Sequence, residues 1–330
     1  MNSAQRRANC GIDKIVEKPK TKNQKLKTRE MTISIVALCH NHAPYLAQAL
    51  DSILAQTQPP LDVWLVDDAS TDGSADILRR YAAAHPRWHL LLLPHNVGNC
   101  RAFNQTLARC QGDWVIDFAT DDVLLPTRLE RQTAFVQTLP AAVGVAYHNA
   151  ELIDEAGRHL HLHHRPDGHG GLRPAPASGF VLPEILARYF ISTPTMLMRR
   201  ACLQALGGYD ETLAYEDFDF WVRAARDWQF AYQNEVLTQK RKHPHQMSAR
   251  QYQLDDPFLT STIAVCHKAL ALCRTPLERR ALAVRLRWEL RQAVRRARPR
   301  EARELYALLR QTTPVPGLLA HALGLWSKLF

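Results

Sequence analysis

The feature that most constrains the fold of this chain is a repeated alternation between short apolar runs and segments of helical periodicity. Apolar runs of strand length occupy residues 33–38, 63–66, 88–93 and 114–118, and a turn and a helical pattern follow each of the first three. Strands that alternate with helices predict a largely parallel sheet that helices cover on both faces. In such sheets, a ligand lies beyond the carboxyl ends of the strands.

Acidic pairs follow two of these apolar runs, where the strands are expected to end. Asp67 and Asp68 follow the second run, and Asp121 and Asp122 follow the fourth. Adjacent carboxylates repel each other unless a cation offsets their charge, and Mg²⁺ or Mn²⁺ binds one or two carboxylates together with phosphate oxygens. The second pair therefore predicts a metal site, although either of its acids could instead cap the following helix. The first pair could accept hydrogen bonds from a nucleotide, or could be ordinary turn acids.

A third acidic pair, Glu216 and Asp217, stands beside aromatic residues. Phe218 and Trp221 recur at helical spacing after it and are expected to anchor a helix in the core. A carboxyl group in apolar surroundings has a raised pKa and can accept a proton from a hydroxyl group. The alternative is that both acids stabilise the start of the helix through its dipole.

Composition divides the chain into three predicted parts. Residues 1–30 are polar and lysine-rich and are predicted to be a disordered basic tail. Residues 31–255 carry the strand and helix pattern, and residues 256–330 are helical in period, with almost no strand signal. Seven scattered cysteines and the lack of a signal peptide or an apolar run of spanning length favour a cytoplasmic location.

The net charge of +10 is concentrated in the basic tail and in an arginine-rich stretch at 279–310. Together with an apolar tail segment that runs from Leu318 to Phe330, these basic helices could hold the chain peripherally at the anionic inner face of a membrane. They could equally be solvated, with the apolar face marked by Leu282, Leu286 and Leu290 packed on the catalytic domain or on a second subunit. No nucleic-acid recognition motif is present, so we expect no nucleic-acid partner.

Taken together, the motifs resemble the inverting glycosyltransferases of family 2, which have the GT-A fold. The resemblance covers roughly residues 32–250 and rests on these segments, in chain order: CHNHAPYL, VDDASTDGS, NVGN, GDWVIDFATDD, GGYDE, EDFDFWVRAA and KHPHQMS. It implies a Rossmann-like, mostly parallel sheet flanked by helices, with the helical C-terminal region as an extension.

The resemblance also implies roles for individual residues. Asp217 would be the general base, with Glu216 beside it, and Asp122 and Asp121 would hold Mn²⁺ or Mg²⁺ and the diphosphate. His243 and Ser248 would belong to a late loop that closes over the donor. The nucleotide-sugar pocket would be lined by Cys39, His40, Asn41, Asp67, Asp68 and Asn96.

Three positions depart from the family pattern. The usual DxD motif would place an acid at position 119, which is Ala119 here, and Asp122 could then be the main metal ligand. Phe103 stands where the family often has an arginine before the asparagine at 104. Asp117 lies two residues before the missing acid and is a poor substitute for it.

The resemblance implies that a nucleotide-diphosphate sugar of the UDP, dTDP or GDP type donates its sugar to a hydroxyl group of a glycan or a lipid-linked acceptor, with inversion. Such enzymes build cell-surface polysaccharides and other glycans. The altered acidic motif leaves one alternative, a catalytically impaired protein that binds nucleotide sugars.

Overall fold

The computed structural model describes residues 31–247 and 257–313. The predictions made for the basic tail, for Ser248, for the boundary near residue 255 and for the apolar tail segment after Leu318 fall outside the described residues. The domain boundary therefore stays a prediction.

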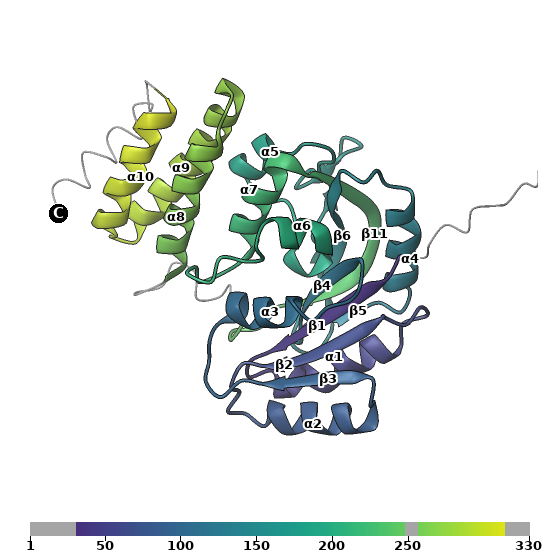
Figure 1. Ribbon diagram of the computed structural model, residues 1–330. Helices are drawn as coiled ribbons and strands as arrows, with labels where there is room; N and C mark the ends of the chain where they lie inside the picture. The colour runs from purple at the N-terminus through teal and green to yellow at the C-terminus, as the bar shows by residue number, and fades with distance from the viewer. Residues whose placement is uncertain (1–30, 248–256, 314–330) are drawn as a thin grey trace, which may run out of the picture. The chain divides into compact units, whose positions relative to one another are not determined.

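The first half of the fold is a block of four parallel strands. These are β1 (Ile33–Cys39), β2 (Asp62–Asp67), β3 (Trp88–Leu92) and β4 (Trp114–Ala119), which lie in the order β3-β2-β1-β4 (Figure 1). The apolar runs form strands as predicted, because central parallel strands are buried on both faces.

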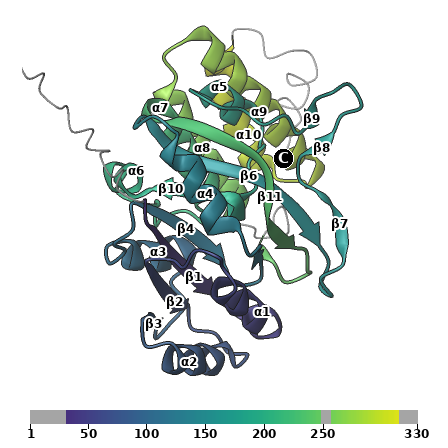
Figure 2. The ribbon, with the colours of Figure 1, turned by 90° about the vertical axis from the view of Figure 1, so that its right-hand side faces the viewer.

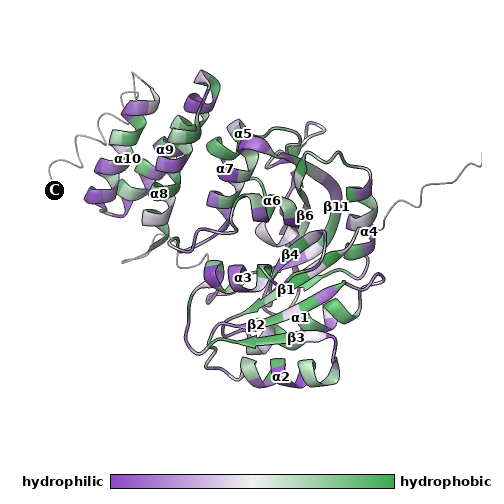
Figure 3. Ribbon diagram, in the orientation of Figure 1, coloured by the Kyte–Doolittle hydropathy of each residue, from purple (hydrophilic) through white to green (hydrophobic). Residues whose placement is uncertain are grey.

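Helices cover both faces of this block. Helix α3 (Asn99–Leu107) packs on one face, and α1 (Ala43–Leu54) and α2 (Ser74–Ala84) pack on the other. The β1 side chains alternate between these two apolar clusters, with Val36 in one and Ile35 in the other. Figure 3 shows the resulting hydrophobic strands between helices with mixed surfaces.

The second half makes the sheet mixed rather than parallel throughout. Strand β10 (Leu197–Arg199) runs antiparallel between β4 and β6 (Val143–Ile153). Strand β11 (Gln229–Arg241) then pairs in parallel with β6 (Figure 2). The two-residue strand β5 (Val123–Leu124) pairs antiparallel with β11 and ends the strand order. This arrangement brings the end of β11 back to the turn that follows β4. The remaining elements of this half are α4 (Arg128–Gln137), β7 (His159–Leu162), β8 (Arg165–Pro166), β9 (Leu172–Arg173), α5 (Leu182–Ala187), η1 (Thr193–Thr195), α6 (Arg200–Ala205) and α7 (Asp217–Asp227).

Three helices follow the sheet: α8 (Pro257–Leu272), α9 (Pro276–Arg295) and α10 (Pro299–Thr312). Helix α8 packs on α7, and α9 packs on α5 and α10. The side chains of Leu282, Leu286 and Leu290 are fully buried in the larger apolar cluster, together with residues of α5 and α7. The leucine spacing thus marks a face of α9 that packs within the protein. No helix among the described residues is long and apolar enough to cross a membrane.

Candidate active site

Loops at the carboxyl ends of β1, β2 and β3 are hydrogen-bonded to one another. The Asp68 carboxylate accepts hydrogen bonds from the backbone N–H groups of Val97 (2.7 Å) and Gly98 (2.9 Å). The His40 ring nitrogen Nδ1 lies 2.7 Å from the carbonyl oxygen of Asp68 and so binds the same turn. Gly98 has a φ of +83°, which favours glycine.

The turn after β2 is held by the loop after β1. Asn41 has a φ of 59°, and its side-chain oxygen accepts a hydrogen bond from the backbone N–H of Thr71 at 2.7 Å. Asp67 accepts one from the backbone N–H of Ser70 at 3.0 Å, while Cys39 is buried below them. A left-handed asparagine is a common solution in such tight loops.

The six residues predicted to line the nucleotide pocket are therefore gathered at one edge of the sheet, but they differ in exposure. Asp67 and Asp68 are buried and bind backbone amides, as turn acids do. His40, Asn41 and Asn96 are exposed, and the Asn96 amide nitrogen lies 3.2 Å from Nε2 of His40. Of the six predicted pocket residues, these three have exposed polar side chains that could contact a nucleotide.

The two acids after β4, Asp121 and Asp122, lie in a turn and differ in exposure. The residues at 117, 119 and 121 are partly exposed, whereas those at 118, 120 and 122 are buried. Asp122 is 3% exposed, and its carboxylate accepts a hydrogen bond from the backbone N–H of Arg241 at 2.8 Å. Burial, and then the charge of Asp121, raises the pKa of Asp122 to about 8. Asp121 is therefore the more accessible of the two carboxylates, and the metal-binding roles of both stay predictions.

His243 joins Asp121 from the loop after β11. Its Nε2 lies 3.0 Å from Oδ2 of Asp121, and its Nδ1 is buried without a partner in the described part of the chain. Burial acts to raise the pKa of Asp121, but the hydrogen bond of His243 and the charges of His42 and His243 outweigh it and lower this pKa. Asp121 is thus kept ionised.

This donor set fits a divalent cation that takes few protein ligands. Among the described residues, no three His, Cys, Asp or Glu side chains cluster as a complete metal cage. Mg²⁺ and Mn²⁺ commonly take one or two carboxylates and fill the remaining positions with phosphate oxygens and water. The ionised Asp121 carboxylate, with the His243 imidazole beside it, offers such a partial site.

Asp217 begins helix α7 on the other side of the site. Its Oδ2 accepts a hydrogen bond from the Thr193 hydroxyl of η1 at 2.9 Å. Burial raises the pKa of Asp217, against the opposing effects of the Thr193 hydrogen bond and the Lys240 charge. The Lys240 charge also lowers the pKa of Asp122 against the larger effect of burial. A partly buried carboxylate with a raised pKa is suited to accept a proton.

Two further acids lie next to Asp217. Glu216 accepts a hydrogen bond from the Asn99 amide, and burial, then Asp217 and Asp117, raises its pKa to about 8. Asp117 accepts a hydrogen bond from the Tyr209 hydroxyl at 3.0 Å, and burial raises its pKa to about 7. The charge of Asp117 on β4 thus acts on Glu216 at the start of α7.

Sequence reasoning missed the groups that position these acids. His42, Lys240 and Tyr209 lie in or next to the quoted motifs, but nothing in their spacing indicates that they face the acids. Phe103, at the position where the family often has arginine, is buried and stacks on Tyr209 with the ring centroids 4.4 Å apart. The Phe103 ring thus packs against the tyrosine whose hydroxyl binds Asp117.

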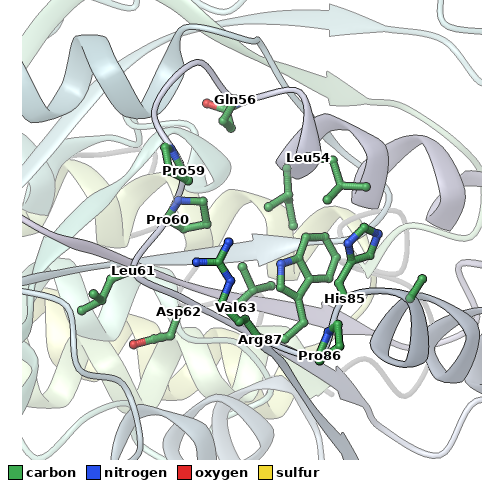
Figure 4. Close-up of a pocket in the computed structure, with 13 residues that line it drawn as sticks. Leu54, Gln56, Pro59, Pro60, Leu61, Asp62, Val63, His85, Pro86 and Arg87 are labelled. Atoms are coloured by element: carbon green, nitrogen blue, oxygen red, sulfur yellow. The ribbon is translucent and has the colours of Figure 1, made fainter.

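A cavity of about 340 Å³ lies at the opposite edge of the sheet (Figure 4). It is lined by the end of α1, the start of β2 and the segment between α2 and β3, at the amino ends of the strands. Because ligands of such sheets bind at the carboxyl ends, this cavity is not the candidate site.

Comparison with known proteins identifies the family. The model of glycosyl transferase family 2 matches residues 34–204, slightly more than half of the chain. An uncharacterized glycosyltransferase of Rickettsia prowazekii is 29% identical over 215 residues, which cover 65% of each protein. A putative teichuronic acid biosynthesis glycosyltransferase of Bacillus subtilis is 35% identical over 104 residues, which cover 32% of this chain and 41% of that protein. The matches thus span less than two thirds of these relatives.

Solved structures show the same fold. S. aureus TarS in complex with UDP superposes with a TM-score of 0.59 at 17% identity, over 90% of this chain and 89% of that one. A Pyrobaculum calidifontis mannosyltransferase in complex with GDP-Man and Mn²⁺ superposes with a TM-score of 0.56 at 21% identity, over 92% and 82%. The chain therefore has the GT-A fold and belongs to glycosyl transferase family 2.

Proposed function

We propose that this chain is an inverting glycosyltransferase that moves a sugar from a nucleotide-diphosphate sugar to an acceptor hydroxyl group. The proposal rests on three sets of residues near one edge of the sheet: the loops after β1, β2 and β3, the acids after β4, and Asp217 at the start of α7. Cys39 pairs with Asp67, and Leu38 pairs with Ala119, so strands β1, β2 and β4 end side by side. The loops that follow β1 and β2 and the acids that follow β4 therefore start at the same edge of the sheet. The Asp217 carboxylate accepts a hydrogen bond from Thr193 of η1, and η1 packs against β4 and β11, the strands that precede Asp121 and His243.

Each group has a distinct role in the proposed reaction. His40, Asn41 and Asn96 bind the nucleotide, and Asp121 with His243 would hold Mn²⁺ or Mg²⁺. When bound, this cation offsets the negative charge that develops on the nucleotide diphosphate as it departs. Asp217 accepts the proton of the acceptor hydroxyl, and Thr193 orients its carboxylate through their hydrogen bond. A single displacement of this kind inverts the configuration at the sugar carbon.

The related proteins support a class of substrates. TarS binds UDP and UDP-GlcNAc, and the Pyrobaculum enzyme binds GDP-Man with Mn²⁺. The B. subtilis relative bears the name of teichuronic acid biosynthesis. We infer a donor of the UDP, dTDP or GDP type and a role in cell-surface polysaccharide or glycan synthesis on the cytoplasmic side, with an acceptor that is a glycan or is linked to a lipid.

Two measurements test this function. Thermal unfolding with UDP, dTDP and GDP and their sugars, each with and without Mn²⁺, identifies the donor, because a ligand of the folded state raises the melting temperature. Release of the nucleotide diphosphate is then measured for the wild type, Asp217→Asn and the matched control Asp227→Asn, which lies exposed at the other end of α7. We expect only Asp217→Asn to lose turnover while it retains donor binding.

The same assay decides the alternative that Ala119 motivates, an impaired protein that only binds nucleotide sugars. That protein would show donor binding in the unfolding assay and no turnover in the wild type with any donor and acceptor. Turnover in Asp217→Asn equal to that of the wild type would refute the assignment of the base.

A further inference from the structure

Helix α9 has an exposed apolar stripe on the side away from its buried leucines. Leu277, Val284 and Trp288 are 56%, 52% and 51% exposed, and these three are among only eight large apolar side chains that are exposed in the described residues. They are seven and four residues apart, which places them on one face of the helix. At 1.5 Å per residue the stripe is about 16 Å long.

Arginines border this stripe. Arg280, Arg291 and Arg295 are exposed, and the helical repeat places them beside or in line with the apolar side chains. The structure gives these three arginines no carboxylate partner within the described residues.

The acids of α9 lie elsewhere on the helix. Glu278 and Glu289 are buried, where Glu278 binds Arg226 at 2.9 Å and caps the helix, and Glu289 lies 3.5 Å from Arg285. The exposed face of α9 is therefore apolar and cationic, with no acid of its own. Residues 257–313 as a whole hold 13 Lys or Arg residues against four Glu residues.

We propose that this face of α9, the α9 stripe, binds the surface of an anionic lipid bilayer. An interfacial helix lies parallel to the membrane with apolar side chains at the boundary of the headgroups and acyl chains and with arginines among anionic headgroups. Tryptophan is the side chain that favours this depth. A second copy of the chain fits the stripe less well, because pairing two α9 stripes would bring their arginines together. The α9 stripe includes no residue of the candidate active site, so this proposal is independent of the transferase activity.

Sedimentation of the full chain with vesicles tests the proposal without donor, metal or acceptor. We expect binding to vesicles of phosphatidylcholine mixed with phosphatidylglycerol, little binding to phosphatidylcholine alone, and release at high salt. Trp288→Ser should lower the partition coefficient about tenfold, and Arg291→Gln should lower it about fivefold. Leu61→Ser is the matched control, because Leu61 is 50% exposed and lies next to β2, and it should bind as the wild type does.

Thermal unfolding of each variant is the control for folding, and we expect melting temperatures close to that of the wild type because the substituted positions are exposed. The proposal is overturned if the wild type does not bind the anionic vesicles, or if Trp288→Ser binds them as well as the wild type does. It is also overturned if sedimentation velocity shows that Trp288→Ser dissolves a dimer and leaves the vesicle binding of the monomer unchanged.

Discussion

The acidity of Asp117 has a measurable consequence for stability. This carboxyl group lies on a central strand, and burial raises its pKa from 3.8 to about 7. An acid with a raised folded-state pKa contributes stability that is fully present below its unfolded pKa and is lost as the pH rises through its folded pKa. Asp117 therefore costs the fold stability progressively between about pH 4 and pH 7, and the whole cost is present above pH 7.

Asp117→Asn removes the ionisable group but keeps an oxygen that can accept the Tyr209 hydrogen bond. A change in pKa from 3.8 to about 7 corresponds to about 4 kcal/mol. Because the side chain is partly exposed, we expect a gain of roughly 2 to 4 kcal/mol at pH 8.5. This gain raises the melting temperature by roughly 4 to 8 °C in a chain of this size. At pH 5 the gain should be roughly a third of that, because most of the cost has not yet developed.

The assay is thermal unfolding followed by circular dichroism from pH 5 to pH 8.5, with Asp227→Asn as the control. The control is exposed and should shift the melting temperature by a similar small amount at every pH. A gain for Asp117→Asn that does not change with pH, or a loss at pH 8.5, would refute the inference that this site holds a carboxyl group that resists ionisation.

Three further predictions concern the site and its support. Asp217→Asn should lower kcat by about 10²- to 10⁴-fold with little change in donor affinity, as nucleotide release assays with Asp227→Asn alongside would show. Asp121→Asn should abolish the rise in melting temperature that Mn²⁺ causes with nucleotide, whereas Asp122→Asn should keep it; the reverse result would make Asp122 the ligand. Arg285→Ala should destabilise the protein by about 3 kcal/mol in urea unfolding, because the buried guanidinium pairs with a glutamate and stacks on two aromatic rings; a change near zero would contradict this.

The sequence predicts the first half of the fold well. Its central strands β1, β2 and β4 are largely buried, so they appear as continuous apolar runs, and β1, β2 and β3 follow one another through single helices and pair in that order. The second half is harder to predict. Strand β6 includes His148 and Asn149 within its buried stretch, and β10 inserts between strands from distant parts of the chain. No local pattern reports pairings of this kind.

The predicted site stays a prediction, and the structure adds contacts among its residues that the sequence does not report. The different exposure of Asp121 and Asp122 could not be predicted from strand alternation, because both residues lie in the turn between β4 and β5. The contact of His243 with Asp121 could not be predicted from the residues alone, because 122 positions separate them. In α9, the leucine spacing reports the buried face, while the arginines between Leu277 and Trp288 conceal the second apolar stripe.

Helix α8 supports the segment that precedes Asp217, the proposed base. Lys268 of α8 binds Asp219 of α7 at 2.7 Å and also binds Asp210, and the Ser261 hydroxyl accepts a hydrogen bond from the backbone N–H of Ala214. These contacts fix the segment that leads into Asp217. The family match ends at residue 204, before this segment. The nucleotide loops, Asp121 and Thr193 thus lie within the match to the family model, whereas Asp217, the proposed base, and its support from α8 lie after it. Substitutions after residue 204 that break these contacts, such as Lys268→Ala, are therefore expected to lower turnover while donor binding is kept.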